Sequence, residues 1–511
     1  MTKILESINQ FVWGIPTLLL ILGVGIYLSI RTGFAQVTLF PKAIRQFFLR
    51  FRRGDSGEQG TSSYRALCTA LAATVGTGNL AGVSGAIAIG GPGAVFWMWV
   101  CAFFGMVIKY AEALLCVRYR VRNGRGEFTG GPMYMIQNGL PSSYRWLGTV
   151  YCFLGVVAAF GVGNATQINT VIGSIKGVLV SFGGTPSDML SLCLGILLAL
   201  LIGWILLGGA GKIGIMAETL VPFASVLYLV LGFGVLTCRM STIPTAFLSI
   251  VKGAFCPSAV TGGVIGSAFS ALRIGASRGV FTNEAGMGTA GIAHSAARVS
   301  HPADQGLMGI IEVFLDTIVI CTMTALVILC SGISIPYGED VGIALTLEAF
   351  SAVYGRWIIL PLCLAICCFA IATILGWGLY GTRCAEYLFG DRAWKPFVVL
   401  QVATVLLGAV LKTGTVWVMS ELVNGLMAIP NLIGLAALSP QLIQLTKKYI
   451  ETTGSKSAVG GTYENFNQCK PVRTFTHEKV SPVGCESKIS RKKDISFEYW
   501  TAGSGNAKGF L

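Results

Sequence analysis

A glycine-containing interruption at the centre of one long apolar segment constrains the fold most. Residues 62–89 are long enough to cross a bilayer, but Val75-Gly76-Thr77-Gly78-Asn79 stands where bulky apolar residues are expected. In lipid, unwound backbone survives only where protein buries it or where it lines a polar cavity. The two glycines permit unwinding, and the threonine and asparagine add polar side chains. The segment therefore predicts a broken transmembrane helix with a binding site at the break, the alternative being a flexible kink or a close helix crossing.

The composition indicates an all-α polytopic membrane protein. Of the 511 residues, 53% are hydrophobic and only 12% are charged. The net charge of +14 is concentrated in a few loops and in the last sixty residues, which is typical of segments beside a bilayer. We therefore expect the lipid bilayer as a partner and no nucleic acid. The sequence contains no Gly-x4-Gly-Lys-Ser/Thr phosphate loop, and no ATPase subunit is expected.

About eleven apolar segments are long enough to span the membrane. They cover approximately residues 11–30, 62–89, 93–117, 147–172, 189–207 and 216–237, and five more begin near residues 261, 305, 357, 396 and 415. Basic residues crowd the connections after the first and third spans, which the positive-inside rule places in the cytoplasm. This orientation puts the N-terminus outside and the C-terminus inside, in the plasma membrane, the inner membrane of a bacterium.

Two units of similar length follow the first span. We divide the chain into residues 1–61 (first span and basic loop), 62–237 (five spans), 238–260 (external connection), 261–437 (five spans) and 438–511 (polar cytoplasmic tail). An odd number of spans per unit forces the two units into opposite orientations, and matching interrupted helices point to a transport site. The second interrupted helix is expected within the Gly-rich stretch between Gly262 and Gly279, with its break not fixed to better than a turn.

Several motifs resemble one transporter family. Four segments are similar to those of the alanine or glycine:cation symporters, the amino acid carrier proteins. They are the signature at residues 90–105, which begins Gly90-Gly91-Pro92-Gly93, the segment at residues 76–83, which begins Gly76-Thr77-Gly78-Asn79, the segment at residues 278–288, which ends Asn283-Glu284-Ala285-Gly286-Met287-Gly288, and residues 312–317 with Cys321. The resemblance covers roughly residues 10–445. It implies a leucine-transporter-like 5+5 inverted repeat with two broken helices, sodium coupling and small neutral amino acids as substrates.

The first break also resembles the unwound first helix of the neurotransmitter:sodium symporters. The resemblance carries the substrate site onto Thr74, Gly76, Thr77, Gly78 and Asn79, with the Thr77 and Gly78 amides meeting the substrate carboxylate. It carries a sodium site onto the carbonyls of Ala72, Val75 and Ala370 and the hydroxyl of Thr373. For Thr373, a hydrogen bond back to its own helix is the alternative.

Side chains for the wall of a substrate pocket are available on three segments. They are Phe269 and Ser270 in the second interrupted helix, Ile374 and Trp377 in the ninth span, and Asn164 and Gln167 in the fourth. The last two lie three residues apart on one helical face, so both can reach a cavity, although such amides also join membrane helices. Trp377, between two glycines, suits a lid that restricts the pocket to small side chains, with ordinary packing as the alternative.

Glu112, Glu312 and Asp316 are carboxylates within apolar segments. Ionisable groups inside a bilayer are costly and are functional candidates by default. Lys109 lies three residues before Glu112, and Arg273 or Arg278 could neutralise the later two, so structural ion pairs are one reading. An uncompensated carboxylate at Glu312 or Asp316 is the other, and it would make the protein a proton-coupled symporter.

The main hypothesis is sodium-coupled uptake of alanine or glycine by alternating access, with sodium as a transported ligand and no cofactor. An intramembrane enzyme is the rival from another class, but the sequence offers no compelling cluster of catalytic carboxylates or histidines near the membrane surface. A passive channel would suit rings of selectivity residues better than paired broken helices.

Overall fold

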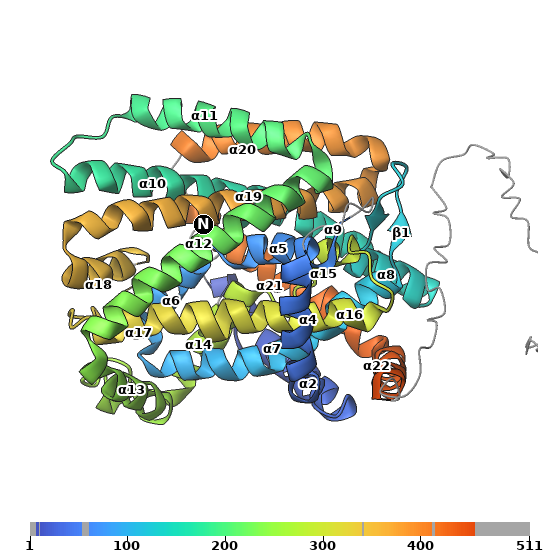
Figure 1. Cartoon of the computed structure of the whole chain (residues 1–511), viewed down its shortest axis with the longest axis horizontal. Coiled ribbons are helices and arrows are strands. Elements are labelled where there is room, and N and C mark those ends of the chain that lie inside the picture. The colour runs from blue at the N-terminus through green and yellow to red at the C-terminus, as the bar shows by residue number, and fades with distance from the viewer. Residues whose placement is uncertain (1–6, 10, 54–60, 340–341, 411–413, 455–511) are drawn as a thin grey trace, which may run out of the picture. The chain divides into compact units, whose positions relative to one another are not determined.

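The structure, a computed structural model, describes residues 7–9, 11–53, 61–339, 342–410 and 414–454. The predicted tail after residue 454 lies outside these residues. Helices make up nearly all of the described chain, and the one sheet found there pairs two short antiparallel strands, β1 (Val121–Arg122) and β2 (Phe128–Thr129). Figure 1 shows the long helices running across the view in roughly one direction, with α11 (Asp188–Leu206) beside α20 (Trp394–Val410) at the top.

Seven helical stretches in the described residues have the length and apolar composition needed to cross a bilayer. They are Gly93–Arg118, Ser142–Ser181, Asp188–Leu206, Gly209–Cys238, Pro302–Cys330, Arg356–Phe389 and Asp391–Val410. Two further helix pairs pass the test when each is counted as one bent span, α5 (Ser63–Thr74) with α6 (Gly78–Gly90), and the last part of α21 (Gly414–Ala437) with α22 (Ser439–Gly454). The described residues thus provide seven to nine spans, and the number eleven and the inverted repeat stay predictions.

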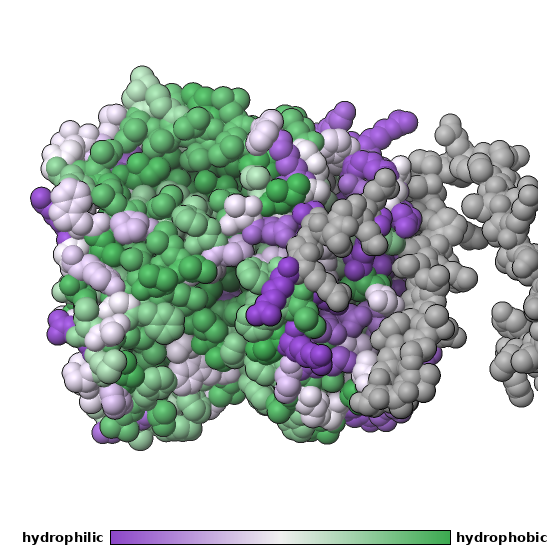
Figure 2. All heavy atoms as spheres, in the orientation of Figure 1, coloured by the Kyte–Doolittle hydropathy of each residue, from purple (hydrophilic) through white to green (hydrophobic). Residues whose placement is uncertain are grey.

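The outer surface of these helices carries large apolar side chains. Leu200 on α11 is 69% exposed, and Val230 on α12 (Gly209–Cys238) is 62% exposed. Figure 2 shows hydrophobic residues over most of the visible face and hydrophilic residues gathered towards the end where β1, α8 (Pro132–Gly139) and α22 lie in Figure 1. An apolar surface of this extent is unfavourable in water and suits lipid.

The first predicted break is present. Ser62 caps α5 by accepting the Arg65 amide at 3.1 Å, and α5 then ends at Thr74 because Val75 takes an extended backbone. Helix α6 begins at Gly78 and is bent by 43° from α5. The two short helices contact α12 and α14 (Ala268–Asn283), and α5 crosses α19 (Ile359–Phe389), so the break is enclosed by protein.

The second interruption lies later than the sequence analysis expected. Gly262 and Gly263 belong to the loop before α14, and α14 itself continues without a break to Asn283. The chain unwinds over residues 284–288 and resumes as α15 (Thr289–Ser295), with Glu284 at φ 53°, Gly286 at φ 94° and Gly288 at φ 77°. The expectation of a break between Gly262 and Gly279 was therefore wrong: glycines within α14 serve close packing, as at Gly275, where an added Cβ would lie 2.2 Å from the Ala94 carbonyl oxygen.

Two long spans contain π-helical turns. One joins α9 (Arg145–Phe160) to α10 (Thr166–Ser181) through η2 (Gly161–Ala165), and the other joins α16 (Pro302–Val313) to α17 (Thr322–Cys330) through η5 (Phe314–Cys321). A π-helical turn adds a residue and rotates the side chains that follow it. The second turn, η5, carries Asp316 and Thr317, which take part in the site described below.

Shorter helices complete the described fold. The predicted first span corresponds to α2 (Ile15–Arg31), and α3 (Ala35–Thr38) and the basic helix α4 (Phe40–Arg53) follow it. The predicted connection 238–260 contains α13 (Ile243–Phe255), which packs against α7 (Gly93–Arg118). Helix α18 (Ala344–Tyr354) precedes α19. Helix α7 also packs between α14 and α16 and carries two of the buried charges, Lys109 and Glu112.

Candidate functional site

The backbone of the first break redirects two amides. In a continuous helix the Gly76 amide would donate to the Ala72 carbonyl, but it donates to Asn79 Oδ1 at 2.8 Å. The Asn79 amide would donate to Val75, but it donates to the Gly76 carbonyl at 3.2 Å. The carbonyls of Ala72 and Val75 are thus deprived of their helical donors, and both residues are buried.

Thr373 of α19 lies directly against this break. A Cβ added to Gly76 would lie 2.7 Å from Thr373 Oγ1, so glycine is needed for the approach. The Thr373 hydroxyl donates to the Phe369 carbonyl at 3.0 Å, which is the alternative that the sequence left open. That bond uses the hydroxyl hydrogen and leaves oxygen lone pairs, so it does not prevent Thr373 from binding a cation. Ala370 lies one turn earlier on the same helix and is buried.

A chain of hydrogen bonds runs from the first break to the second. Asn79 Nδ2 donates to Asp316 Oδ1 at 2.7 Å, and the Thr317 hydroxyl donates to Asp316 Oδ2 at 2.8 Å. Asn283 Nδ2 then donates to Thr317 Oγ1 at 3.1 Å, while Asn283 Oδ1 accepts the Ala285 amide at 2.9 Å. The side chains of Asn79, Asp316 and Thr317 are fully buried, and η5 supplies the two central members. Asp316 is thereby brought to the site, with neutral partners.

Glu284 occupies the second break and holds Trp377. The Trp377 indole donates to Glu284 Oε1 at 3.1 Å, and the Thr289 hydroxyl donates to Glu284 Oε2 at 2.5 Å. Trp377 is 1% exposed, and an added Cβ on Gly163 would lie 2.3 Å from its Cβ. The indole ring is thus fixed between the π-helical turn η2 and the second break.

Glu112 of α7 binds the unwound backbone of the second break. Its Oε1 accepts the Gly286 amide at 2.9 Å, the Gly288 amide at 3.1 Å and Asn431 Nδ2 at 2.7 Å. The Asn431 amide also donates to the Gly286 carbonyl at 2.8 Å. A buried carboxylate and an amide thus replace the helical hydrogen bonds that the break gives up.

The buried lysine pairs with a different carboxylate from the one expected. Lys109 Nζ lies 2.9 Å from Glu312 Oε1, and His294 Nε2 lies 2.8 Å from Glu312 Oε2, all three side chains being fully buried. Arg278, which with Arg273 was a candidate to neutralise Glu312 or Asp316, pairs with Glu421 at 2.7 Å. The expected Lys109–Glu112 pair is replaced because Glu112 Oε1 faces the amides of the break. Glu312 is thus committed to an ion pair.

The two amides of the fourth span point to different partners. Gln167 Oε1 accepts the Thr77 hydroxyl at 3.0 Å and so reaches the first break. Asn164 Nδ2 instead donates to the Gln401 carbonyl at 2.9 Å and joins η2 to α20. The expectation that both face one cavity assumed α-helical spacing, and Asn164 lies inside the π-helical turn, where that spacing does not hold.

Three other predicted wall residues are not brought to the breaks. Phe269 is 51% exposed and Ser270 is its neighbour in the first turn of α14, far along the chain from the break at Glu284. Ile374 packs in an apolar cluster with Ile168 and Leu206, whereas Trp377 belongs to a different cluster. Phe269 and Ser270 were predicted as pocket walls because an earlier break in α14 was expected. Ile374 was predicted as a wall because it lies near Trp377 in the sequence.

Sequence reasoning missed several residues at the site. Phe281 and Thr282 lie 3.8 Å from the position of a Cβ on Gly78 and so face the beginning of α6. Glu284 lies in segment 278–288, one of the segments that resemble the transporter family, but no role was predicted for it. The signal that could have located the second break is Gly286-Met287-Gly288, which repeats the Gly-x-Gly spacing of Gly76-Thr77-Gly78.

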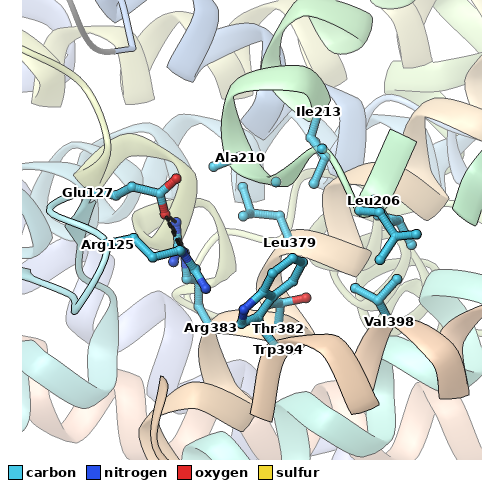
Figure 3. Close-up of a pocket in the computed structure, with 13 residues that line it drawn as sticks. Arg125, Glu127, Leu206, Ala210, Ile213, Leu379, Thr382, Arg383, Trp394 and Val398 are labelled. Atoms are coloured by element: carbon cyan, nitrogen blue, oxygen red, sulfur yellow. Dashed lines mark hydrogen bonds and ion pairs between the residues drawn. The ribbon is translucent and has the colours of Figure 1, made fainter. Parts of the chain in front are cut away.

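A separate pocket of about 210 Å³ lies at the end of α19 beyond Trp377, and Figure 3 shows its charged residues on one side and its apolar residues on the other. Arg383 donates to Glu127 Oε2 and to Glu386 Oε2, each at 2.8 Å, and Arg125 donates to Glu386 at 2.5 Å. The Gly124 amide adds a bond to Asp391 at 2.8 Å. The loop between β1 and β2 is thus tied to the end of α19 by ion pairs that we call the hairpin clamp.

Comparison with known proteins shows the family and the fold of this chain. The sodium:alanine symporter family matches residues 1–460. The sodium/alanine symporter AgcS of Methanococcus maripaludis is 41% identical over 455 residues, covering 88% of this chain and 97% of that protein. The probable sodium/glutamine symporter GlnT of Bacillus subtilis is 36% identical over 495 residues, covering 94% of this chain and 99% of that protein.

The crystal structure of MhsT in complex with L-phenylalanine matches this chain with a TM-score of 0.53 at 14% identity. The match covers 76% of this chain and 99% of that one, and it shows a leucine-transporter-like fold. The protein is a multi-pass membrane transporter rather than an enzyme, and the chain belongs to the sodium:alanine symporter family.

Proposed function

We propose that this protein is a secondary active transporter that moves a small neutral amino acid, alanine or glycine, into the cell together with sodium. The observation that carries the proposal is the pair of carbonyls, Ala72 and Val75, deprived of their helical donors beside the Thr373 hydroxyl. Sodium is a hard cation that prefers several oxygen ligands. Together with the Ala370 carbonyl, these groups form the proposed sodium site between α5 and α19.

The substrate is proposed to bind at the beginning of α6. The first amides of a helix have no partners within it, and the positive end of the helix dipole favours a carboxylate there. The Thr77 and Gly78 amides are the proposed donors, with Thr74, Gly76 and Asn79 shaping the backbone. Phe281 and Trp377 are the proposed walls for the side chain, and Gln167 orients the Thr77 hydroxyl at 3.0 Å.

Alternating access is proposed to occur at the two breaks. Helices α5 to α12 and α14 to α21 would act as the two inverted repeats, each beginning with a broken helix. The hydrogen-bond chain through Asp316 supports the proposal because it links one break to the other. The basic loops favour a cytoplasmic C-terminus and an external N-terminus in the plasma membrane.

Proton coupling is the second candidate, and the contacts of the carboxylates favour sodium over it. Glu312 is neutralised by Lys109 and is also hydrogen-bonded to His294. Asp316 has both oxygens occupied by Asn79 and Thr317. Neither carboxylate is left to exchange a proton without loss of a bond that organises the breaks.

Sodium coupling provides enough free energy for concentrative uptake. A membrane voltage of about 100 mV contributes roughly 2.3 kcal/mol per inward charge, and a tenfold sodium gradient adds about 1.4 kcal/mol. One sodium ion would therefore support accumulation of roughly several hundredfold.

Uptake by purified protein in liposomes tests the proposal. We expect labelled alanine to enter when an inward sodium gradient is imposed, and not when a proton gradient replaces it in sodium-free buffer. Competition with glycine, serine and glutamine defines the substrate range, because one relative is named a sodium/alanine symporter and another a probable sodium/glutamine symporter. Equal uptake with the proton gradient alone would refute sodium coupling, and preferred competition by glutamine would refute the small-side-chain assignment.

A further inference from the structure

In the described helices around the two breaks, buried carboxylates outnumber the buried lysine that could neutralise them. Glu112, Glu284, Glu312 and Asp316 are each 4% exposed or less, and Lys109 is fully buried with them. Lys109 pairs with Glu312, so the other three have hydrogen-bond donors as partners but no lysine or arginine in a described ion pair. Burying a carboxylate without a compensating charge is costly. A positive charge from outside the chain would be stabilised here.

The contacts of these carboxylates single out one of them. Both oxygens of Asp316 accept side-chain hydrogen bonds, and both oxygens of Glu284 do so as well. Glu112 is different: its Oε1 accepts three hydrogen bonds, whereas its Oε2 is buried and has no hydrogen-bond partner among the described residues. A buried carboxylate oxygen without a hydrogen-bond partner is a candidate ligand for an ion.

Other oxygens without a described partner lie around the same break. Asn431, whose amide nitrogen binds Glu112, has its Oδ1 buried and unpartnered in the described structure. The buried hydroxyls of Tyr151 and Tyr380 likewise have no described partner. Both tyrosines pack in the cluster that contains Met287 of the second break. Carboxylate, amide and hydroxyl oxygens are the ligands that hard cations prefer.

We propose that Glu112 Oε2 is the charged ligand of a second monovalent cation of the sodium class, bound at the second break with Asn431 Oδ1 as a neighbouring oxygen. This inference rests on the proposed function, since the cation would be transported with the amino acid. It differs from the predicted sodium site at Thr373, which lies at the first break and contains no carboxylate. The consequence is a ratio of two cations to one amino acid.

The test counts sodium ions in the full-length protein. Equilibrium binding of ²²Na⁺ to purified protein with saturating alanine is expected to give two ions per chain, and reversal potentials in proteoliposomes are expected to give two charges per alanine at both pH 6 and pH 8. Glu112→Gln keeps an oxygen for the Gly286 and Gly288 amides but removes the charge, so it is expected to bind one ion. Glu218→Gln, on α12 and paired with Arg65 outside both breaks, is the matched control and is expected to bind two.

The count for the unaltered protein decides the proposal even if Glu112→Gln is not recovered in folded form. One sodium ion per alanine would overturn it, as would two ions in both the unaltered protein and Glu112→Gln. One sodium ion together with one proton per alanine would also overturn it, because Glu112 would then carry a proton. In each of these cases uptake is still driven by sodium, so the proposed function stands, whereas absence of sodium-driven uptake would mean that the proposed function itself has failed.

Discussion

Asn79 Nδ2 donates to Asp316 Oδ1 at 2.7 Å, and the same asparagine accepts the Gly76 amide at 2.8 Å. One side chain thus fixes the unwound backbone of the first break and joins it to the π-helical turn η5. Thr317, the residue after Asp316, accepts from Asn283 at the edge of the second break. The two breaks therefore share one buried hydrogen-bond path.

The first prediction concerns Asp316→Asn. The variant keeps an oxygen for Asn79 but offers an NH₂ group where the Thr317 hydroxyl now donates, so the path is interrupted. We expect the KM for alanine to rise about tenfold, equivalent to ~1.4 kcal/mol, with both net uptake and alanine exchange impaired. Asp188→Asn, at an exposed position at the beginning of α11, is the control. Full exchange with loss of net uptake would instead identify Asp316 as a proton carrier.

The second prediction uses the close approach of Gly76 to Thr373. In Gly76→Ala the new Cβ would lie 2.7 Å from Thr373 Oγ1 and would push the hydroxyl away from the break. We expect the half-saturating sodium concentration for uptake to rise by at least about tenfold, ~1.4 kcal/mol. Gly82→Ala on α6 is the matched control because its Cβ would make only an ordinary 3.5 Å contact with Thr282. Similar sodium dependence in the two variants would contradict the role assigned to this contact.

The third prediction separates the two roles of the Thr373 hydroxyl. Thr373→Ser keeps an oxygen, whereas Thr373→Val keeps the volume and removes both the oxygen and its bond to Phe369. We expect Val to weaken sodium dependence of uptake about tenfold and Ser to preserve it within about threefold. Thermal unfolding of both variants is the control for a purely structural effect. If Val lowers the unfolding temperature but leaves the half-saturating sodium concentration unchanged, Thr373 is not an ion ligand.

The sequence was informative where a local pattern has one physical meaning. A Gly-x-Gly pair with polar neighbours at the centre of an apolar segment predicts unwinding, and the break at residues 75–77 lies where that pattern is. The same logic failed for the second break because glycines also serve helix packing. Gly275 and Gly279 face α7 within an intact helix, and only Gly286 and Gly288, at positive φ, mark the unwound segment.

Partners of buried charges could not be derived from spacing along the chain. Lys109 and Glu112 lie one turn apart, yet Lys109 pairs with Glu312 on another helix. The amides of the second break take the Glu112 oxygen, and those amides come from residues 286 and 288. Likewise, the π-helical turn that separates Asn164 from Gln167 depends on packing against α19, α20 and α21, which no local pattern reports.

The fourth prediction concerns the hairpin clamp. Burial raises the pKa of Glu127, but Arg383 and Arg125 act in the opposite direction and leave that pKa lowered from 4.5. Because this pKa is lowered, the Glu127 carboxylate is charged at every pH above the usual carboxyl pKa. Its charge is lost only as the pH falls through the lowered pKa. The clamp is therefore expected to stay ionised at neutral pH, and Glu127→Gln, rather than a change of pH between 6 and 8, is expected to loosen it.

Limited trypsin digestion of purified protein measures this loosening. Glu127→Gln removes the negative charge that faces Arg383, while Arg383 keeps its ion pair with Glu386, so we expect faster cleavage after Arg122 and Arg125 with an unchanged unfolding temperature of the helical core. Glu339→Gln, in the loop before α18, is the control. Cleavage at the rate of the unaltered protein would show that the ion pair between Glu127 and Arg383 does not restrain the hairpin.

The last prediction is a pH dependence of stability that originates at His301. This residue precedes α16, and its Nδ1 accepts the Ala303 amide at 3.1 Å as the helix N-cap, which requires a neutral ring. Burial lowers the pKa of His301 below 6.5; Asp304 acts in the opposite direction, while Lys448 and Lys42 lower it further. Since the unfolded chain binds this proton more readily, the cap contributes its full stability above about pH 6.5 and loses it as the pH falls through the lowered pKa.

We expect the unfolding temperature to drop between pH 7.5 and pH 5, and to drop less in His301→Asn, because asparagine caps a helix without titrating. An equal drop in both proteins would show that the acid sensitivity arises elsewhere.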